Sequence, residues 1–159
     1  MIRSGFATSF TVVALTIVGT AGAAEPITTG KTPLEYIFPK GQHKPSVPIS
    51  PAVKAGNILY VSGTPAYDKS GKFAVGDFPA QMNQVMENIS ETLKSAGTGW
   101  DRVVKVNVFL KRREDFKEMN RIYATYFQNG RYPARTTAIV VSLPQPDALL
   151  EIECEAVIQ

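Results

Sequence analysis

Residues 132–144 read Tyr-Pro-Ala-Arg-Thr-Thr-Ala-Ile-Val-Val-Ser-Leu-Pro, and this stretch decides the fold. Pro133 fixes its own φ at about −65° and pushes the residue before it out of the helical region, so an extended entry precedes Arg135. The β-branched residues after Arg135 predict a strand. Two prolines between Leu143 and Asp147 end it, and Ala148 to Ile158 predicts a second strand.

Charged side chains occupy positions in these two strands that could form a binding or catalytic site. Arg135 opens the first, and the second carries Glu151 and Glu153 two residues apart, so both carboxylates point to one face. A guanidinium can grip a planar carboxylate, and an acid can move a proton or hold a water. The same residues also fit a solvated charge at the start of a strand and two carboxylates on the solvent-exposed side of an edge strand. Spacing alone leaves the interpretation as a site and the interpretation as solvated charges both open.

The first 24 residues differ in kind from the rest. Arg3 precedes a short apolar run that ends in Ala21-Gly22-Ala23-Ala24, the pattern of a cleavable signal peptide. A membrane anchor is the alternative, but the run is shorter than the about 20 residues that a spanning helix needs. We predict a signal peptide at 1–24, a proline-rich N-terminal tail at 25–44 that is not a packed element, and a periplasmic or secreted mature protein with no membrane attachment.

Composition favours one globular domain and excludes several functional classes. The 159 residues are 44% hydrophobic and 19% charged, and a net charge of +3 is too weak to indicate a nucleic-acid partner. Cys154 is the only cysteine, so an intramolecular disulfide is impossible, and His43 is the only histidine. One histidine and one cysteine do not build the usual zinc sites or a Ser-His-Asp triad.

The rest of the chain alternates between strand and helix patterns. The predicted elements are a hairpin at 52–63 with its turn at Gly56-Asn57, a short strand at 72–75, a helix at 77–97, a strand at 103–110 and a helix at 114–128. The order β-β-β-α-β-α-β-β predicts a single α+β domain, with two helices on one face of a mostly antiparallel sheet. Since no third helix covers the other face, we expect it to be buried against copies of the chain.

Apolar side chains define the faces of these elements. Asp77 is the predicted cap of the first helix and Gly97 its end, with a core stripe of Phe78, Met82, Val85, Met86, Ile89 and Leu93. The second helix has a stripe of Phe116, Met119, Tyr123, Tyr126 and Phe127, and Asn129-Gly130 ends it. The strand between them should turn Val104, Val106, Val108 and Leu110 to the core.

Several motifs, in the same order along the chain, resemble the Rid family (reactive intermediate deaminases, also called the YjgF family). They are the 132–144 stretch with Glu151-Ile152-Glu153, Gly56 to Gly63, Gln81 to Gly97, Val103 to Leu110, and Phe116 to Asn120 with Tyr123 and Phe127. The resemblance covers about residues 45–159, the predicted Rid-like domain. It implies a chorismate-mutase-like homotrimer with three clefts between subunits. It also implies hydrolysis of enamines and imines such as 2-aminoacrylate to 2-keto acids and ammonia.

The resemblance assigns roles to five residues. Arg135 matches the arginine that holds the substrate carboxylate, and Glu151 matches the acid that positions or activates the water, so these two are the predicted catalytic residues. Thr137, Asn120 and Gly63 join Arg135 as predicted substrate-binding residues, since Gly63 at a strand end would let a ligand come close. The implied ligand is a small 2-imino or 2-keto acid, and the implied chemistry calls for no metal or organic cofactor.

Two departures from the family pattern leave two functions open. The family's deaminases usually carry a tyrosine where this chain has Ile49, and commonly a cysteine where it has Thr137. The first function is an exported deaminase of small 2-imino acids. The alternative is a non-catalytic trimeric binder of small carboxylate metabolites. Retention of Glu151 favours the deaminase, and RNA cleavage, attributed to some relatives, fits poorly with the weak charge.

Overall fold

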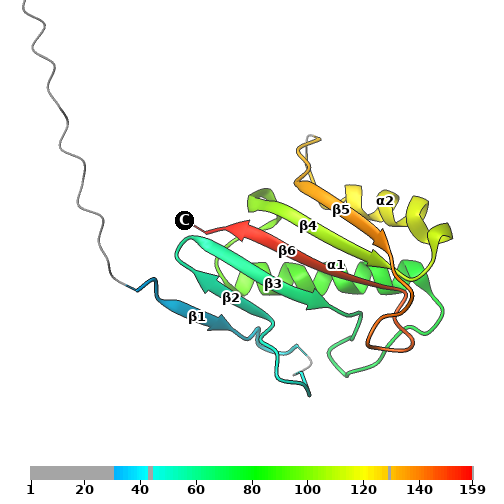
Figure 1. The fold of residues 1–159 in the computed structure, drawn as a ribbon, viewed down its shortest axis with the longest axis horizontal. Helices are drawn as coiled ribbons and strands as arrows, with labels where there is room; N and C mark the ends of the chain where they lie inside the picture. Colours follow the sequence, from blue (N-terminus) through cyan, green and yellow to red (C-terminus); the bar gives the residue numbers. More distant parts are fainter. Residues whose placement is uncertain (1–30, 43–44, 129, 159) are drawn as a thin grey trace, which may run out of the picture. The chain divides into compact units, whose positions relative to one another are not determined.

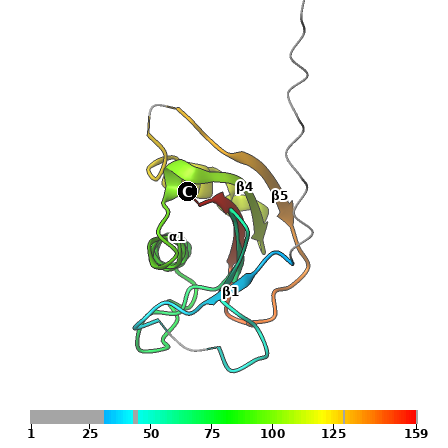
Figure 2. The same cartoon turned by 90° about the vertical axis from the view of Figure 1, so that its left-hand side faces the viewer.

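A computed structural model describes residues 31–42, 45–128 and 130–158 of the chain. In this part, two α-helices lie on one face of a six-stranded sheet (Figures 1 and 2). The signal peptide predicted at 1–24, the start of the tail, His43 and Asn129 lie outside the described residues. No helix in the described part is both long and apolar enough to cross a membrane.

The elements follow the predicted α+β order along the chain. They are β1 (Leu34–Ile37), β2 (Ala52–Ala55), β3 (Ile58–Thr64), α1 (Phe78–Ser95), β4 (Val103–Leu110), α2 (Phe116–Ala124), β5 (Ala134–Ile139) and β6 (Leu150–Val157), with short 3-10 helices at Trp100–Arg102 and Arg113–Asp115. In space the strand order is β1-β2-β3-β6-β4-β5, and only β4 and β5 run parallel. The mostly antiparallel sheet with two helices on one face is therefore confirmed.

The first strand is not the one that the sequence predicted. The tail was expected to hold no packed element, yet β1 pairs with β2 along its whole length, with Tyr36 opposite Val53. Prolines flank β1 on both sides, which an edge strand tolerates because only one of its sides has to hydrogen-bond. The strand predicted at 72–75 is reduced to a single bridge between Tyr67 and Phe73. The Asp68 side chain accepts hydrogen bonds from Ser70 and from the Lys72 N–H there and holds a turn instead.

Two further predictions about faces were wrong in detail. Val104 is 45% exposed, and Val103, which is only 7% exposed, lies in the core instead. The cause is a shift in the pairing register with β6 between Val103 and Lys105. Such a bulge swaps the faces of the residues on either side of it. In the second helix Phe116 is 44% exposed, since the α-helix begins only at that residue, after a turn of 3-10 helix, and ends at Ala124 rather than near 128.

The predicted core of α1 is confirmed. All six side chains of its apolar stripe are buried, Asp77 caps the helix by accepting a hydrogen bond of 3.0 Å from the Ala80 N–H, and Gly97 ends it at φ 75°. Strand β6 packs beneath this helix with strict alternation of buried and half-buried residues. Leu150, Ile152 and Cys154 face the helices, so Glu151 and Glu153 face the open side of the sheet.

A buried amide that sequence reasoning missed fixes the start of β6. Gln81, on α1, is fully buried. Its Nε2 donates to the carbonyl oxygens of Ala74 and Asp147, at 2.8 and 3.0 Å, and its Oε1 accepts from the Leu149 N–H at 2.8 Å. Two of these hydrogen bonds thus join the first turn of the helix to the residues that lead into Glu151, and the third holds the segment before the helix. Glutamine within a helical stripe gives no signal of this role before the fold is known.

Replacing Gln81 tests that anchor. We expect Gln81→Met, which preserves side-chain length, to lower the free energy of unfolding by about 2–4 kcal/mol, because a buried N–H without an acceptor costs about 1–3 kcal/mol and the lost hydrogen bonds add to it. Chemical denaturation measures the change. The control Gln84→Met, on the same helix with one side-chain hydrogen bond to Asn88, should cost less than about 1 kcal/mol. Equal losses in the two variants would contradict the assigned role.

Candidate functional site

Arg135 lies near the start of the edge strand β5, on the face that the helices cover. Its Nη2 donates to Oδ1 of Asn120 at 2.6 Å, and its guanidinium carbon lies 4.7 Å from the ring centroid of Tyr123. Its Nη1 lies 3.7 Å from the sulfur of Met119. All three partners are on α2, so that helix fixes the arginine in one orientation. None of the ion pairs among the described residues includes Arg135, which leaves its positive charge uncompensated.

Two hydroxyl groups near this arginine are buried without a partner. Thr137 Oγ1 and Tyr123 Oη are the buried side-chain polar atoms that form no hydrogen bond within the described residues. Burial raises the pKa of Tyr123 to about 12, so its hydroxyl keeps its proton at neutral pH. Buried polar groups are nearly always satisfied, and an unsatisfied pair beside an unpaired cation fits a ligand with several acceptor oxygens. We call Arg135, Asn120, Thr137 and Tyr123 the anion-binding cluster, a candidate site for a carboxylate.

Glu151 lies on the open side of the sheet, against the end of β3. A Cβ atom placed on Gly63 would overlap the Glu151 carboxyl group, so this approach requires glycine. Glu151 forms no hydrogen bond or ion pair that the described part of the chain provides. Burial raises the pKa of its carboxyl group, and the nearby negative charge of Glu153 raises it further. The acid is thus half-buried, unpaired and easier to protonate than an ordinary glutamate.

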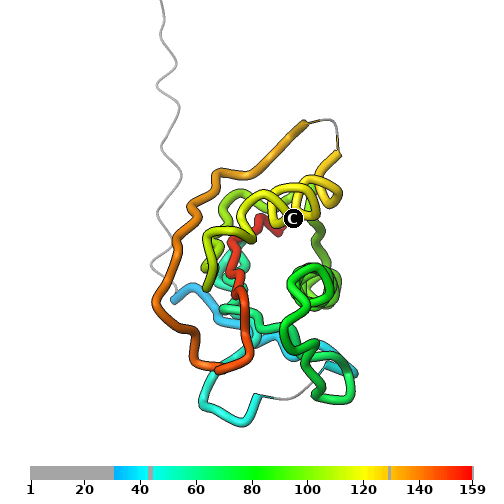
Figure 3. The backbone as a smooth tube through the Cα atoms, turned by 90° about the vertical axis from the view of Figure 1, so that its right-hand side faces the viewer, coloured from blue at the N-terminus to red at the C-terminus, as the bar shows by residue number. Residues whose placement is uncertain are grey.

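A cavity of about 400 Å³ opens beside this carboxyl group. Its walls come from three loops, from α1 and from the strands β3 and β6, and they include Val47, Ile49, Gly63, Pro65, Pro144 and Glu151. The connection from β5 to β6 runs from orange to red in Figure 3, and its residues Pro144 and Gln145 line the cavity. Both Glu151 and Gly63 line it, as a substrate site requires, and neither Arg135 nor Thr137 does.

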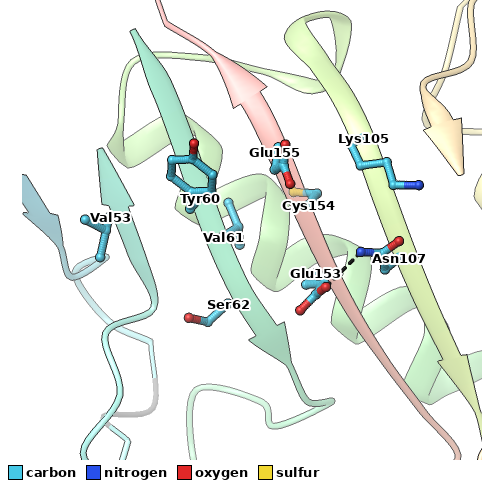
Figure 4. Close-up of a pocket in the computed structure, with 9 residues that line it drawn as sticks. All are labelled: Val53, Tyr60, Val61, Ser62, Lys105, Asn107, Glu153, Cys154 and Glu155. Carbon is cyan, nitrogen blue, oxygen red and sulfur yellow. Dashed lines mark hydrogen bonds between the residues drawn. The ribbon is translucent and has the colours of Figure 1, made fainter. Parts of the chain in front are cut away.

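A second hollow, of about 270 Å³, lies in the middle of the open face (Figure 4). Its central polar groups are already paired, because Asn107 Nδ2 donates to Glu153 Oε1 at 2.8 Å and Lys105 Nζ donates to Thr136 Oγ1 at 2.8 Å. Cys154 lies beneath it, and burial raises the pKa of its thiol to about 12, which keeps the sulfur protonated. We therefore assign this hollow to the sheet surface and keep Glu151 as the candidate acid.

The structure separates the predicted site residues into two groups. Arg135, Asn120 and Thr137 belong to the anion-binding cluster, whereas Glu151 and Gly63 line the cavity. Strand β4 lies between β5 and β6, and its register places Arg135 level with Val106, on the helix side, and Glu151 level with Phe109, on the open side. The two predicted catalytic residues thus lie on opposite faces of one sheet and do not meet within one chain.

Comparison with known proteins identifies the family. The model of the family described as Endoribonuclease L-PSP matches residues 41–158. A RutC family protein of Pyrococcus horikoshii is 44% identical over 123 residues, which cover 77% of this chain and 96% of that protein. The structure of YyfA from Yersinia pestis, described as a conserved Rid family protein, is 35% identical with a TM-score of 0.76, covering 79% of this chain and all of that one. The chain belongs to the Rid family. One Rid relative, the 3-aminoacrylate deaminase RutC of Acinetobacter baylyi, is 41% identical over 121 residues, 76% of this chain and 94% of that protein.

Sequence reasoning missed two of the residues that hold Arg135 in this Rid protein. Met119 and Tyr123 were assigned to the core stripe of the second helix, and both are indeed buried, at 0% and 3% exposure. The sulfur of Met119 and the ring face of Tyr123 nevertheless contact Arg135. The available signal was their spacing from Asn120, because residues three and four apart share a helix face with their neighbours. An apolar stripe that contains an amide at its edge can hold a cation as well as form a core.

The electrostatic state of Glu151 can be tested without any substrate. We expect its carboxyl group to titrate above its ordinary pKa of 4.5, because burial and Glu153 both disfavour the charged form. Glu153→Gln should lower that pKa without restoring the ordinary value, since burial is the larger cause. Carboxyl ¹³C shifts followed by NMR measure both. Glu114→Gln, an exposed acid on another element, should leave the pKa unchanged, and a Glu151 that titrates below 4.5 would contradict the arrangement.

Proposed function

We propose that this protein hydrolyses 2-imino acids, and the enamines that are their tautomers, to 2-keto acids and ammonia, in a site shared by two copies of the chain. The observation that carries the proposal is the unpaired Arg135 with its two unsatisfied hydroxyl neighbours, which fits a carboxylate ligand. The half-buried, unpaired acid Glu151 supplies the second requirement, a group that exchanges protons with water. The relative from Acinetobacter baylyi, named a 3-aminoacrylate deaminase, supports the same class of reaction.

The position of the two groups on opposite faces calls for a second copy. A cyclic assembly joins two different surfaces of each subunit, so the β5 edge of one copy can meet the Glu151 cavity of the next. The open face of the sheet also needs cover, because Tyr60 at 49% exposure and Tyr36 at 60% lie on it without a layer above them. We propose the homotrimer that the family resemblance implies, with three such clefts.

The anion-binding cluster would hold and orient the substrate. A guanidinium fixed by Asn120 and by the ring of Tyr123 presents its remaining N–H groups in a rigid plane, to which a carboxylate can bind with two hydrogen bonds. The hydroxyl group of Thr137 can donate to the same oxygens. Holding the carboxylate this way leaves C2 and its nitrogen directed out of the cluster, toward the acid of the neighbouring copy.

Glu151 would then carry the proton transfers. As a carboxylate it takes one proton from a water whose oxygen bonds to C2, and the C=N double bond becomes a single bond in a carbinolamine. It next returns that proton to nitrogen, the C–N bond breaks, and the proton of the C2 hydroxyl group leaves with ammonia as ammonium. The overall change is one protonated imine plus one water to one 2-keto acid plus one ammonium ion. A raised pKa suits a group that must both accept and donate.

A non-catalytic binder of small carboxylates remains the alternative function. Such a binder needs Arg135 and gains nothing from an unpaired acid in the same cleft, because a negative charge repels the ligand. The close approach that Gly63 allows would also have no purpose in a binder. Both observations favour the deaminase. The export of that deaminase stays a proposal that rests on the sequence of residues 1–24 alone.

Mixing two inactive variants tests the shared site. Arg135→Ala should lower kcat/KM for any 2-imino acid by about 10²-fold or more, because charge-assisted hydrogen bonds are lost, and Glu151→Gln should lower it by about 10²–10⁴-fold, because its proton carrier is lost. Neither change should lower the melting temperature much. When the two variants are co-expressed, about a quarter of the clefts of randomly assorted trimers pair an intact Arg135 with an intact Glu151. Activity should therefore return to roughly that share, measured as 2-keto acid formed above spontaneous hydrolysis.

The controls separate the possible failures. Co-expressing Arg135→Ala with the double variant Arg135→Ala/Glu151→Gln leaves no intact cleft and should restore nothing. A site formed within one chain would also show no recovery in the test mixture, which contradicts the shared cleft. Wild-type protein that binds 2-keto acids by calorimetry and shows no turnover would identify the binder instead. Light scattering that shows a monomer at micromolar concentration would exclude both forms of the proposal.

A further inference from the structure

We infer that the preferred substrate is a 2-imino acid with an apolar side chain of four or more carbons, and that Ile49 selects it. This inference rests on the proposed function and goes beyond it in naming the substrate class. The cavity beside Glu151 carries the argument through its size, its lining and its position relative to the reacting carbon.

The cavity is larger than a three-carbon substrate needs. Water occupies about 30 Å³ per molecule in the liquid, so a space of about 400 Å³ corresponds to roughly thirteen waters. A three-carbon imino acid has six non-hydrogen atoms, and its carboxylate group would lie outside the cavity, at Arg135 of the neighbouring copy. Little more than C2, its nitrogen and a methyl group would then be left to occupy a space several times larger.

The orientation of the bound substrate follows from where its carboxylate and its C2 atom are held. C2 of a 2-imino acid is a trigonal carbon, so its carboxylate and its side chain leave it in two different directions. With the carboxylate held by one copy and C2 beside Glu151 of the other, the side chain points away from the arginine and into the cavity that contains Glu151. Glu151 and Gly63 thus lie at the reacting end of the cavity, and Val47 and Ile49 line the remainder together with Pro65 and Pro144.

Several of the hydrogen-bond donors along this wall are already engaged. Ser62 Oγ donates to the Ser50 carbonyl oxygen at 2.8 Å, and Thr64 Oγ1 donates to the Ser62 carbonyl oxygen at 2.9 Å. The amide of Asn88 donates to the carbonyl oxygens of Pro65 and Tyr67, at 3.1 and 2.8 Å. A polar side chain buried here would lose hydrogen bonds to water without replacing them, which disfavours it.

The charged groups of the cavity do not alter this conclusion. Asp68 accepts hydrogen bonds from the Ser70 and Lys72 N–H groups of its own turn, and Lys69 is exposed to solvent. Glu151 is committed to the reaction, and its negative charge would repel an acidic side chain. The wall also offers free aliphatic surface, because Val47 is 62% exposed and Ile49 is 43% exposed. Burying that surface against an apolar side chain is favourable.

Ile49 is the residue on which the selection depends. It follows Pro48 in the loop before β2 and presents a branched aliphatic group to the cavity. A larger side chain at this position would fill the space that we assign to the substrate, while leaving Glu151 and Arg135 untouched. The identity of this one residue should therefore shift the ranking of substrates by size.

A substrate series measures that ranking. An amino-acid oxidase generates the imino acids of alanine, leucine and phenylalanine in situ, and 2-keto acid formed above spontaneous hydrolysis gives kcat/KM for each. We expect the leucine-derived imine to exceed the alanine-derived one by at least about 10-fold, since filling an apolar pocket by one or more methylenes is worth that much. Ile49→Tyr should reduce this ratio by about 10-fold or more. Val75→Tyr, an exposed valine outside the cavity, should leave it unchanged.

Binding separates failure of the inference from failure of the proposed function. Calorimetry with pyruvate and with 4-methyl-2-oxopentanoate should show tighter binding of the larger keto acid, and loss of that preference in Ile49→Tyr. If no imine is turned over while this preference holds, the deaminase proposal fails and the side-chain site stands. If imines are turned over but the alanine-derived one is preferred, or Ile49→Tyr leaves the ranking unchanged, the inference is overturned while the function stands.

Discussion

The alternation of side chains along β6 is the constraint on which the rest of the structure depends. This strand lies between β3 and β4, so both of its edges are hydrogen-bonded and its register cannot slip without moving three strands. Burial of Leu150, Ile152, Cys154 and Ala156 on the helix side commits the four alternate positions of the strand to the open face. Glu151 therefore points away from the core because of its neighbours, and the hydrogen bonds of Gln81 keep the start of the strand in place.

The same register places Arg135 on the opposite face of the sheet from Glu151, so the two side chains of one chain cannot contact the same substrate. Parallel pairing with β4 sets Arg135 level with Val106, and Val106 faces the helices. Moving the arginine to the open face would require a one-residue slip of β5, which would also move Thr137 away from α2. An assembly of identical copies resolves this geometry without any slip, because a cyclic interface joins the front of one subunit to the edge of the next. In the proposed trimer, assembly and catalysis would both follow from this strand order.

Sequence reasoning reached those features that depend on local pattern. The period of α1, its Asp77 cap and its glycine end predict that helix, and the resemblance of residues 132–144 pointed to Arg135 and Glu151 before any fold was known. It failed where long-range pairing decides the outcome. Nothing in Leu34–Ile37 distinguishes an edge strand from a proline-rich tail until β2 offers a partner, and the bulge that exposes Val104 depends on the pairing with β6. The separation of Arg135 from Glu151 depends on the order of the strands in the sheet. That spatial order differs from the order along the chain and cannot be deduced from it.

The unsatisfied groups of the anion-binding cluster are the strongest sign that its form serves a ligand. A buried hydroxyl group without a partner costs about 1–3 kcal/mol, and phenylalanine at 123 or valine at 137 would remove that cost with almost no change in shape. Selection for stability alone would favour those residues, since they leave the packing of α2 on β5 as it is. Tyr123 and Thr137 instead keep hydroxyl groups that the described chain does not satisfy, beside a cation that it does not neutralise. Unsatisfied buried polar groups and an unneutralised cation occur together where a binding site requires them. One bound carboxylate would satisfy the two hydroxyl groups and the guanidinium at once.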